Sequence, residues 1–150
     1  MSRISIASPQ EAVPIDRARL REIARAVLEG EGVAAAAVSL AFVDNATIHR
    51  LNKQFLGHDE PTDVLTFPLS GPGAKALEGE VVIGAETARA QAAERGHDEQ
   101  AELALYVVHG LLHLCGYDDT TAKAAARMRQ RERYYLQRLG LPPIADTPPA

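Results

Sequence analysis

The segment from His109 to Asp119, which reads HGLLHLCGYDD, holds the side chains of this chain that are best suited to bind a metal ion. His109 and His113 are four positions apart, and in a helix that spacing places both imidazoles on one face, where one ion can bind a nitrogen of each. Gly116 is a natural end for that helix, because glycine readily adopts the left-handed conformation that reverses the chain. Asp118 and Asp119 follow the reversal, so one of these carboxylates can return to the imidazoles. Two histidines and a carboxylate leave one tetrahedral position for water, as in hydrolytic zinc sites.

Each residue of this segment also has a purely structural interpretation. Both imidazoles can be satisfied by backbone carbonyls, and Asp119 can be the N-cap of the helix expected after it. Asp118 either accepts an imidazole N–H and fixes its tautomer, or belongs to the turn. Gly110 stands where zinc proteases of the HExxH type carry their general base, so the pattern disfavours peptide hydrolysis. Cys115 is two positions from His113 and therefore points to another helix face, which favours a small core side chain over a ligand.

The composition is that of an ordinary soluble domain of 150 residues. No stretch of about 20 residues is continuously apolar, so we expect no membrane span. The first 14 residues lack a basic region followed by an apolar run, so they do not resemble a secretory signal. A single cysteine excludes an internal disulfide and fits the reducing cytoplasm, which is the location we expect.

Positive charge is concentrated near the end of the chain, although the formal net charge is −4. Lys123, Arg127 and Arg131 share one stripe of a predicted helix, in a segment where Glu132 is the opposing acid. A local basic patch of this kind is sufficient for contacts with nucleic-acid phosphates. The alternative is a solvated helix face without a ligand.

Hydrophobic periodicity and turn signals predict elements in the order β-α-β-α-β-β-α-α-α. The predicted strands are 3–7, 35–43, 64–68 and 81–83, and the predicted helices are 15–28, 45–55, 85–95, 99–115 and 121–139. This order is typical of a single α+β domain in which a small mixed four-stranded sheet packs with about five helices. We expect the domain to span residues 1–140 and the proline-rich residues 141–150 to form a disordered tail.

The segment from His109 to Asp119 closely resembles HGxLHLxGYDH, the signature of the YbeY family of bacterial rRNA maturation factors. Two further blocks match in the same order. Leu51 and Asn52, followed by PTDVLTFP over residues 61–68, resemble the family's LN…PTDVLSFP, and GEVVI over residues 79–83 resembles its GDIxI strand. Three ordered motifs at compatible spacings make the likeness specific.

This resemblance implies a metal-dependent, single-strand-specific endoribonuclease that acts in rRNA maturation, including the 16S 3′ end, and in ribosome quality control. It implies one zinc ion per chain, held by three signature histidines, of which two correspond to His109 and His113 and the third to Asp119. A carboxylate is an acceptable zinc ligand, but it shifts the preference toward harder ions such as Mn²⁺. The implied partners are single-stranded rRNA and the ribosome or its small subunit, and neither DNA nor a membrane is expected.

A second departure from the family pattern concerns the contact with RNA. Leu56 stands where the family usually carries an arginine that the resemblance places on the RNA, and Lys53, Arg50 or His58 can supply the missing charge. We therefore predict RNA binding through Lys53, Lys123, Arg127 and Arg131. The two departures keep a second function open, that of a non-catalytic, metal-binding ribosome assembly factor.

Overall fold

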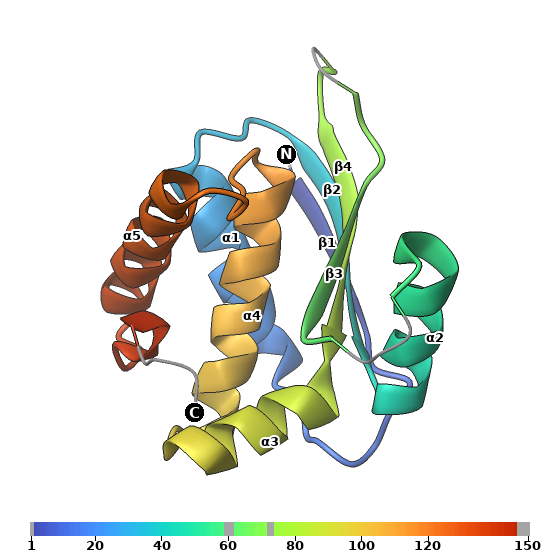
Figure 1. Ribbon diagram of the computed structural model, residues 1–150. Coiled ribbons are helices and arrows are strands. Elements are labelled where there is room, and N and C mark those ends of the chain that lie inside the picture. The colour runs from blue at the N-terminus through green and yellow to red at the C-terminus, as the bar shows by residue number, and fades with distance from the viewer. Residues whose placement is uncertain (1, 59–61, 72–73, 147–150) are drawn as a thin grey trace.

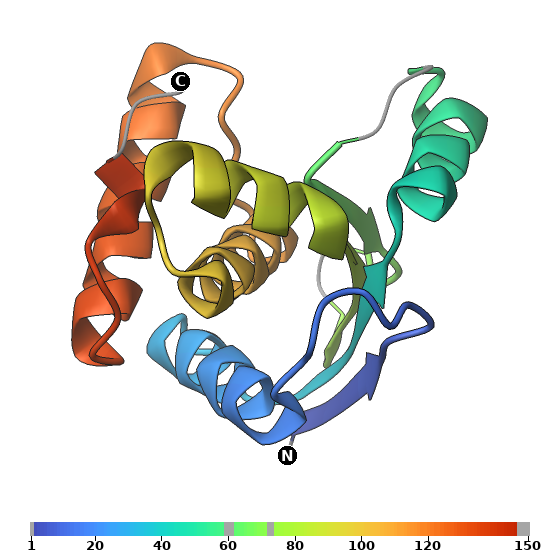
Figure 2. The ribbon, with the colours of Figure 1, turned by 90° about the horizontal axis from the view of Figure 1, so that it is seen from below.

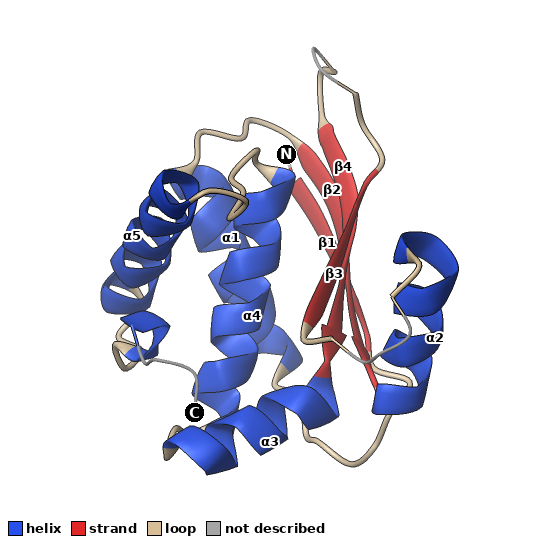
Figure 3. Ribbon diagram, in the orientation of Figure 1, coloured by secondary structure: helices blue, strands red, loops and turns tan. Residues whose placement is uncertain are grey.

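Four segments with apolar residues at alternate positions form one mixed sheet in the computed structural model, which describes residues 2–58, 62–71 and 74–146 (Figure 1). The strands are β1 (Ser2–Ala7), β2 (Ala36–Val43), β3 (Val64–Pro68) and β4 (Leu77–Gly84), in the spatial order β1-β2-β4-β3. β1, β2 and β4 are parallel, and β3 runs antiparallel to β4 (Figure 3). The predicted strand at 81–83 is therefore too short, because the polar residues Glu78 and Glu80 alternate with inward-facing residues of the same strand.

All of the α-helices in the described residues except the third begin at a capping side chain. The helices are α1 (Arg17–Gly30), α2 (Asn45–Leu56), α3 (Ala85–Arg95), α4 (Glu99–Leu114) and α5 (Ala122–Arg138). Asp16, Asp44, Asp98 and Thr121 each accept a hydrogen bond from the backbone N–H three residues later, an interaction worth about 1 kcal/mol per helix. These elements confirm the predicted α+β class and the element order.

The two faces of the sheet are covered unequally (Figures 1 and 2). α1 and α4 pack on one face, and α5 covers them from outside. α2 lies alone on the opposite face, where Ile48 packs with Val43, Leu65 and Val82. On the outer face of β1 and β2, Ser5 and Ser39 are exposed. No helix among the described residues is long and apolar enough to cross a membrane.

α4 is the central helix of the domain, and ten of its sixteen residues are buried. It reaches the sheet closely because Gly110 has no side chain. A Cβ atom at this position would lie 2.4 Å from Cγ1 of Val81 and 3.2 Å from Cγ1 of Val64. The glycine that follows the first histidine of the signature is thus required by packing.

The end of the described chain packs on α4 and α5. Ile144–Asp146 forms a short 3-10 helix, and Ile144 is buried against Ala101 and Leu136. Leu141 and Ala145 pack against the same cluster. Residues 147–150 lie outside the described residues, as do residues 59–61, which include Pro61 of the PTDVLTFP block.

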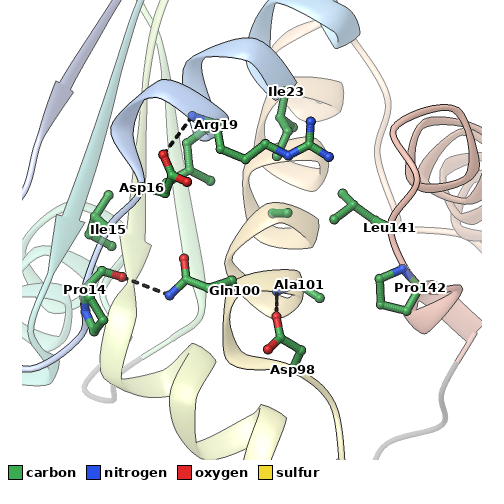
Figure 4. Close-up of a pocket in the computed structure, with 12 residues that line it drawn as sticks. Pro14, Ile15, Asp16, Arg19, Ile23, Asp98, Gln100, Ala101, Leu141 and Pro142 are labelled. Carbon is green, nitrogen blue, oxygen red and sulfur yellow. Dashed lines mark hydrogen bonds between the residues drawn. The ribbon is translucent and has the colours of Figure 1, made fainter.

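The same segment lines a cavity of about 480 Å³ together with the first turns of α1 and α4 (Figure 4). Leu141 and Pro142 face Ile15 across it, and Gln100 donates a hydrogen bond to the Pro14 carbonyl. Of the lining residues on α4, Ala104 is the nearest to the histidines, five residues or about 7.5 Å along the helix axis before His109, and neither histidine lines the cavity. The cavity is therefore separate from the histidine pair.

Candidate metal centre

His109 and His113 meet on one face of α4, as their spacing predicts. Their Nε2 atoms are 3.1 Å apart and their rings are nearly perpendicular, with an interplanar angle of 77°. Two imidazole nitrogens bound tetrahedrally to one zinc ion at about 2.0–2.1 Å would be separated by about 3.3 Å. The two nitrogens therefore either share one proton or bind one divalent ion with little rearrangement.

Asp119 joins this pair from the bend beyond the helix. Gly116, with φ of 105°, reverses the chain, and the Tyr117 backbone N–H donates to the Leu112 carbonyl at 3.0 Å. One ligand atom from each of His109, His113 and Asp119 lies within 4.8 Å of the other two. The alternative that Asp119 is a helix N-cap is wrong, because Thr121 caps α5. The three side chains form a group that could hold a metal ion.

Glu132 of α5 completes the arrangement and was not predicted from the sequence. Its Oε2 accepts a hydrogen bond of 2.6 Å from Nδ1 of His109, and the residue is 5% exposed. A carboxylate that is hydrogen-bonded to one ring nitrogen of a histidine fixes the tautomer of the imidazole and leaves its other nitrogen free to bind a metal. Of the two interpretations of Asp118, the structure agrees with the turn, because its carboxylate accepts from the backbone N–H and hydroxyl of Thr120. The sequence feature that could have pointed to Glu132 is that it is an acidic residue within an otherwise basic segment.

The environments of the two imidazoles differ. Burial lowers the pKa of His109, but the hydrogen bond and negative charge of Glu132 outweigh burial and raise the pKa above its ordinary value. Burial and the neighbouring His109 lower the pKa of His113. These directions favour a proton on His109 beside Glu132 and a neutral His113, whose Nε2 lies 3.1 Å from Nε2 of His109 and can accept a hydrogen bond from it.

A second polar cluster supports the turn that carries Asp119. The Glu31 carboxylate, at the end of α1, accepts hydrogen bonds from Nε and Nη2 of Arg131 at 3.1 and 2.6 Å and from the hydroxyl of Tyr135. Burial raises the pKa of Glu31, but hydrogen bonds from Tyr135, Arg131 and Tyr117 lower it by more. The cluster therefore ties α1 and α5 to Tyr117, two residues before Asp119.

We expect the contribution of this cluster to stability to depend on pH. Because the folded-state pKa of Glu31 lies below its ordinary 4.5, ionised Glu31 stabilises the protein above pH 4.5, and this stabilisation is lost as the pH falls through the lowered pKa. Glu31→Gln should reduce the free energy of unfolding by about 1–3 kcal/mol at pH 7 and by less at pH 3. Urea unfolding at pH 7, 5 and 3 measures the difference. An equal loss at all three pH values would contradict the assigned role of the charge.

The predicted RNA-binding residues are separated by the structure. Lys123 and Arg127 line a cavity of about 250 Å³ beside Gly116, and the Arg127 guanidinium lies 5.0 Å from the centre of the Tyr117 ring. Arg131 is instead paired with Glu31, so its charge is already neutralised within the protein. Lys53 lies on α2, on the opposite face of the sheet (Figure 1). Sequence periodicity groups residues along one helix but does not show which layer that helix occupies.

Comparison with known proteins identifies the family. A model of the family described as endoribonuclease YbeY matches residues 5–140. The chain is 43% identical over 148 residues to an endoribonuclease YbeY of Pelotomaculum thermopropionicum, covering 92% of this chain and 97% of the relative. It is 44% identical over 133 residues to that of Moorella thermoacetica, covering 81% and 85%.

A solved structure agrees with this result. The solution structure of a Thermotoga maritima protein matches with a TM-score of 0.67 and 29% identity, over 91% of this chain and 88% of that protein. The family model and these relatives together show that this chain belongs to the YbeY family of endoribonucleases.

Proposed function

We propose that this chain is a metal-dependent endoribonuclease that cleaves single-stranded RNA in rRNA maturation, including the 16S 3′ end. The observation that carries the proposal is the pair of imidazole nitrogens 3.1 Å apart, backed by Glu132 and accompanied by Asp119, in a chain of an endoribonuclease family. The proposed catalytic unit is the domain over residues 1–140. We place its activity in the cytoplasm, on the ribosome or its small subunit.

The proposed ion is one Zn²⁺ per chain, held by Nε2 of His109 and His113 and by a carboxylate oxygen of Asp119. Nitrogen donors favour zinc, whereas the carboxylate makes Mn²⁺ the next candidate. When bound, such an ion supplies Lewis-acid polarisation of a phosphoryl oxygen and lowers the pKa of water. Glu132 holds the His109 ring in the orientation that directs Nε2 at the ion.

The proposed RNA surface lies where α5 begins. Lys123 and Arg127 supply positive charge beside the turn that carries Asp119, and the Tyr117 ring lies under the Arg127 guanidinium. Basic side chains next to an aromatic ring are suited to a single strand, because phosphates pair with the cations and an unpaired base can stack. Arg131 is not included, because it is bound to Glu31.

An RNA cleavage assay with and without a chelator tests this function. Purified protein is incubated with a single-stranded rRNA fragment after chelation, and Zn²⁺ or Mn²⁺ is then restored. We expect cleavage to stop on chelation and to return with the ion. If the protein binds the ion stoichiometrically but leaves RNA intact with every ion tested, the enzyme proposal fails, and a non-catalytic, metal-binding assembly factor becomes the better description.

Glu132→Gln tests the hydrogen bond behind the metal centre. The amide keeps the shape of the side chain but removes the negative charge on His109, so we expect the affinity for Zn²⁺ to fall by roughly 10–100-fold. Competition with a chromophoric chelator measures it. Glu94→Gln, at an exposed position of α3, is the control and should bind Zn²⁺ like the wild type. Equal affinities for the two variants would mean that Glu132 has only a packing role.

A further inference from the structure

A separate small cavity adjoins the candidate metal centre on the other side of the His109 ring. Its volume is about 170 Å³. His109 and Glu132 form one wall, and the remaining lining residues come from α3, from α4 and from the position before β3: Asp63, Gln91, Arg95, Leu105 and Tyr106. The cavity therefore shares His109 with the metal centre and opens a second polar surface beside it.

Arg95, the last residue of α3, is the unusual member of this lining. Its Nε atom is buried and has no hydrogen-bond partner, and no ion pair involves its guanidinium within the part of the chain that the structure describes. Arg89 on the same helix is bonded to Glu99 at 2.6 Å. A buried guanidinium N–H without an acceptor is costly, so Arg95 indicates an acceptor that the protein itself does not provide.

The acids that line the cavity, Asp63 and Glu132, each accept hydrogen bonds from other donors through one carboxylate oxygen, and neither accepts one from Arg95. Asp63 accepts hydrogen bonds from the Val64 backbone N–H at 2.8 Å and from the Thr62 hydroxyl at 3.3 Å. Glu132 is bound to His109 at 2.6 Å. Glu102, whose buried Oε2 also has no hydrogen-bond partner, does not line the cavity and forms no ion pair with Arg95, so the Nε of Arg95 remains available to an acceptor from outside. A guanidinium presents a planar fork of N–H donors that matches the oxygens of a phosphate.

The cavity and its position match one part of an RNA strand. A volume of 170 Å³ equals about five or six water molecules, which is room for a phosphate group but not for a nucleoside. Along α4, the cavity borders Leu105 to His109, whereas the Lys123 and Arg127 cavity borders Gly116, beyond His113. The histidine pair therefore lies between Arg95 on one side and Lys123 and Arg127 on the other.

We propose that Arg95 binds a backbone phosphate of the RNA on the α3 side of the histidine pair. Arg95 is then a substrate-binding residue, and the strand passes over the histidines between Arg95 and the Lys123 and Arg127 cavity. This inference rests on the proposed function, because it takes RNA as the ligand.

The test measures RNA binding separately from cleavage. Metal-loaded wild type, Arg95→Gln and Arg95→Lys are titrated into a fluorescent single-stranded RNA whose 2′-O-methyl groups slow cleavage, at several salt concentrations. We expect Arg95→Gln to bind roughly tenfold more weakly. The slope of log K against log salt should fall by about 0.7, as for the loss of one phosphate contact on a single strand. Arg95→Lys should keep the slope but recover only part of the affinity.

Arg89→Gln is the matched control, since it removes a paired arginine from the same helix. It should leave RNA affinity and salt slope unchanged, and metal content should be unchanged in all variants. If Arg95→Gln matches the wild type in affinity and slope while the wild type cleaves RNA, this inference fails and the proposed function stands. If Arg95→Gln lowers only the urea midpoint, Arg95 is structural. If the metal-loaded wild type neither binds nor cleaves RNA, both proposals fail.

Discussion

Replacing His113 with alanine should leave the protein folded but unable to retain a divalent ion. The half-buried imidazole is one of only two nitrogens in the His109, His113 and Asp119 group, so its removal leaves one nitrogen and one exposed carboxylate. Removal of a residue that only orients a metal ligand typically lowers metal affinity or activity by roughly 10–100-fold, and removal of the ligand itself should cost more. We therefore expect RNA cleavage to fall by more than about 100-fold. Elemental analysis of purified protein and the cleavage assay measure the two effects.

Matched variants separate this effect from a general loss of histidine. His58→Ala removes an exposed histidine outside the metal centre and should keep the metal content of the wild type. Asp119→Ala should weaken metal binding, and Asp119→His, which restores the third histidine of the family signature, should strengthen it relative to alanine. Unchanged metal content in Asp119→Ala would show that Asp119 is not a ligand, and retained content in His113→Ala would remove the basis of the metal centre.

Gly110→Ala should cause the largest loss of stability among the substitutions considered for α4. The added Cβ would lie 2.4 Å from Cγ1 of Val81, so the helix must move away from the sheet or Val81 must change its conformation. Overpacking of a core by one methyl group typically costs about 1–3 kcal/mol. Because Gly110 is adjacent to His109, we also expect weaker metal binding. Urea unfolding with an unchanged m-value measures the loss of stability.

A double-mutant cycle shows whether this collision is the cause. Val81→Ala alone creates a cavity and should destabilise the protein, but in combination with Gly110→Ala it makes room for the new methyl group. The double variant should therefore lose less free energy of unfolding than the two single variants lose together. Gly71→Ala is the control, because a Cβ there meets no atom within 4 Å. Strict additivity of Gly110→Ala and Val81→Ala would contradict the packing argument.

The sequence predicts the local parts of this molecule well, because their determinants lie close together in the chain. Helix caps such as Asp44 and Asp98 accept from N–H groups three residues later, and the histidine pair needs only one helical turn. The order of elements and the shared face of His109 and His113 follow from periodicity alone. Asp119 was also predicted as a ligand, with a helix N-cap as the alternative. Only the structure excludes the N-cap, because Thr121 caps α5.

The missed features depend on contacts between residues that are distant in the sequence. Glu132 reaches His109 across 23 positions, and Arg131 reaches Glu31 across 100. Both acids are buried by packing between helices, which no local pattern reveals. The sequence left two interpretations of Asp118 open, and the structure has the local one, in which its carboxylate accepts a hydrogen bond from Thr120, two residues away.

The bare outer face of β1 and β2 makes the protein convenient for site-specific labelling. Ser39 points outward from a central strand on the side opposite α4, so Ser39→Cys would carry a fluorophore without touching the histidine helix. Burial raises the pKa of the natural Cys115 thiol to about 11, which leaves little reactive thiolate at neutral pH. A maleimide dye should therefore modify the introduced thiol selectively, and energy transfer to a labelled oligonucleotide would then follow its arrival and departure in real time.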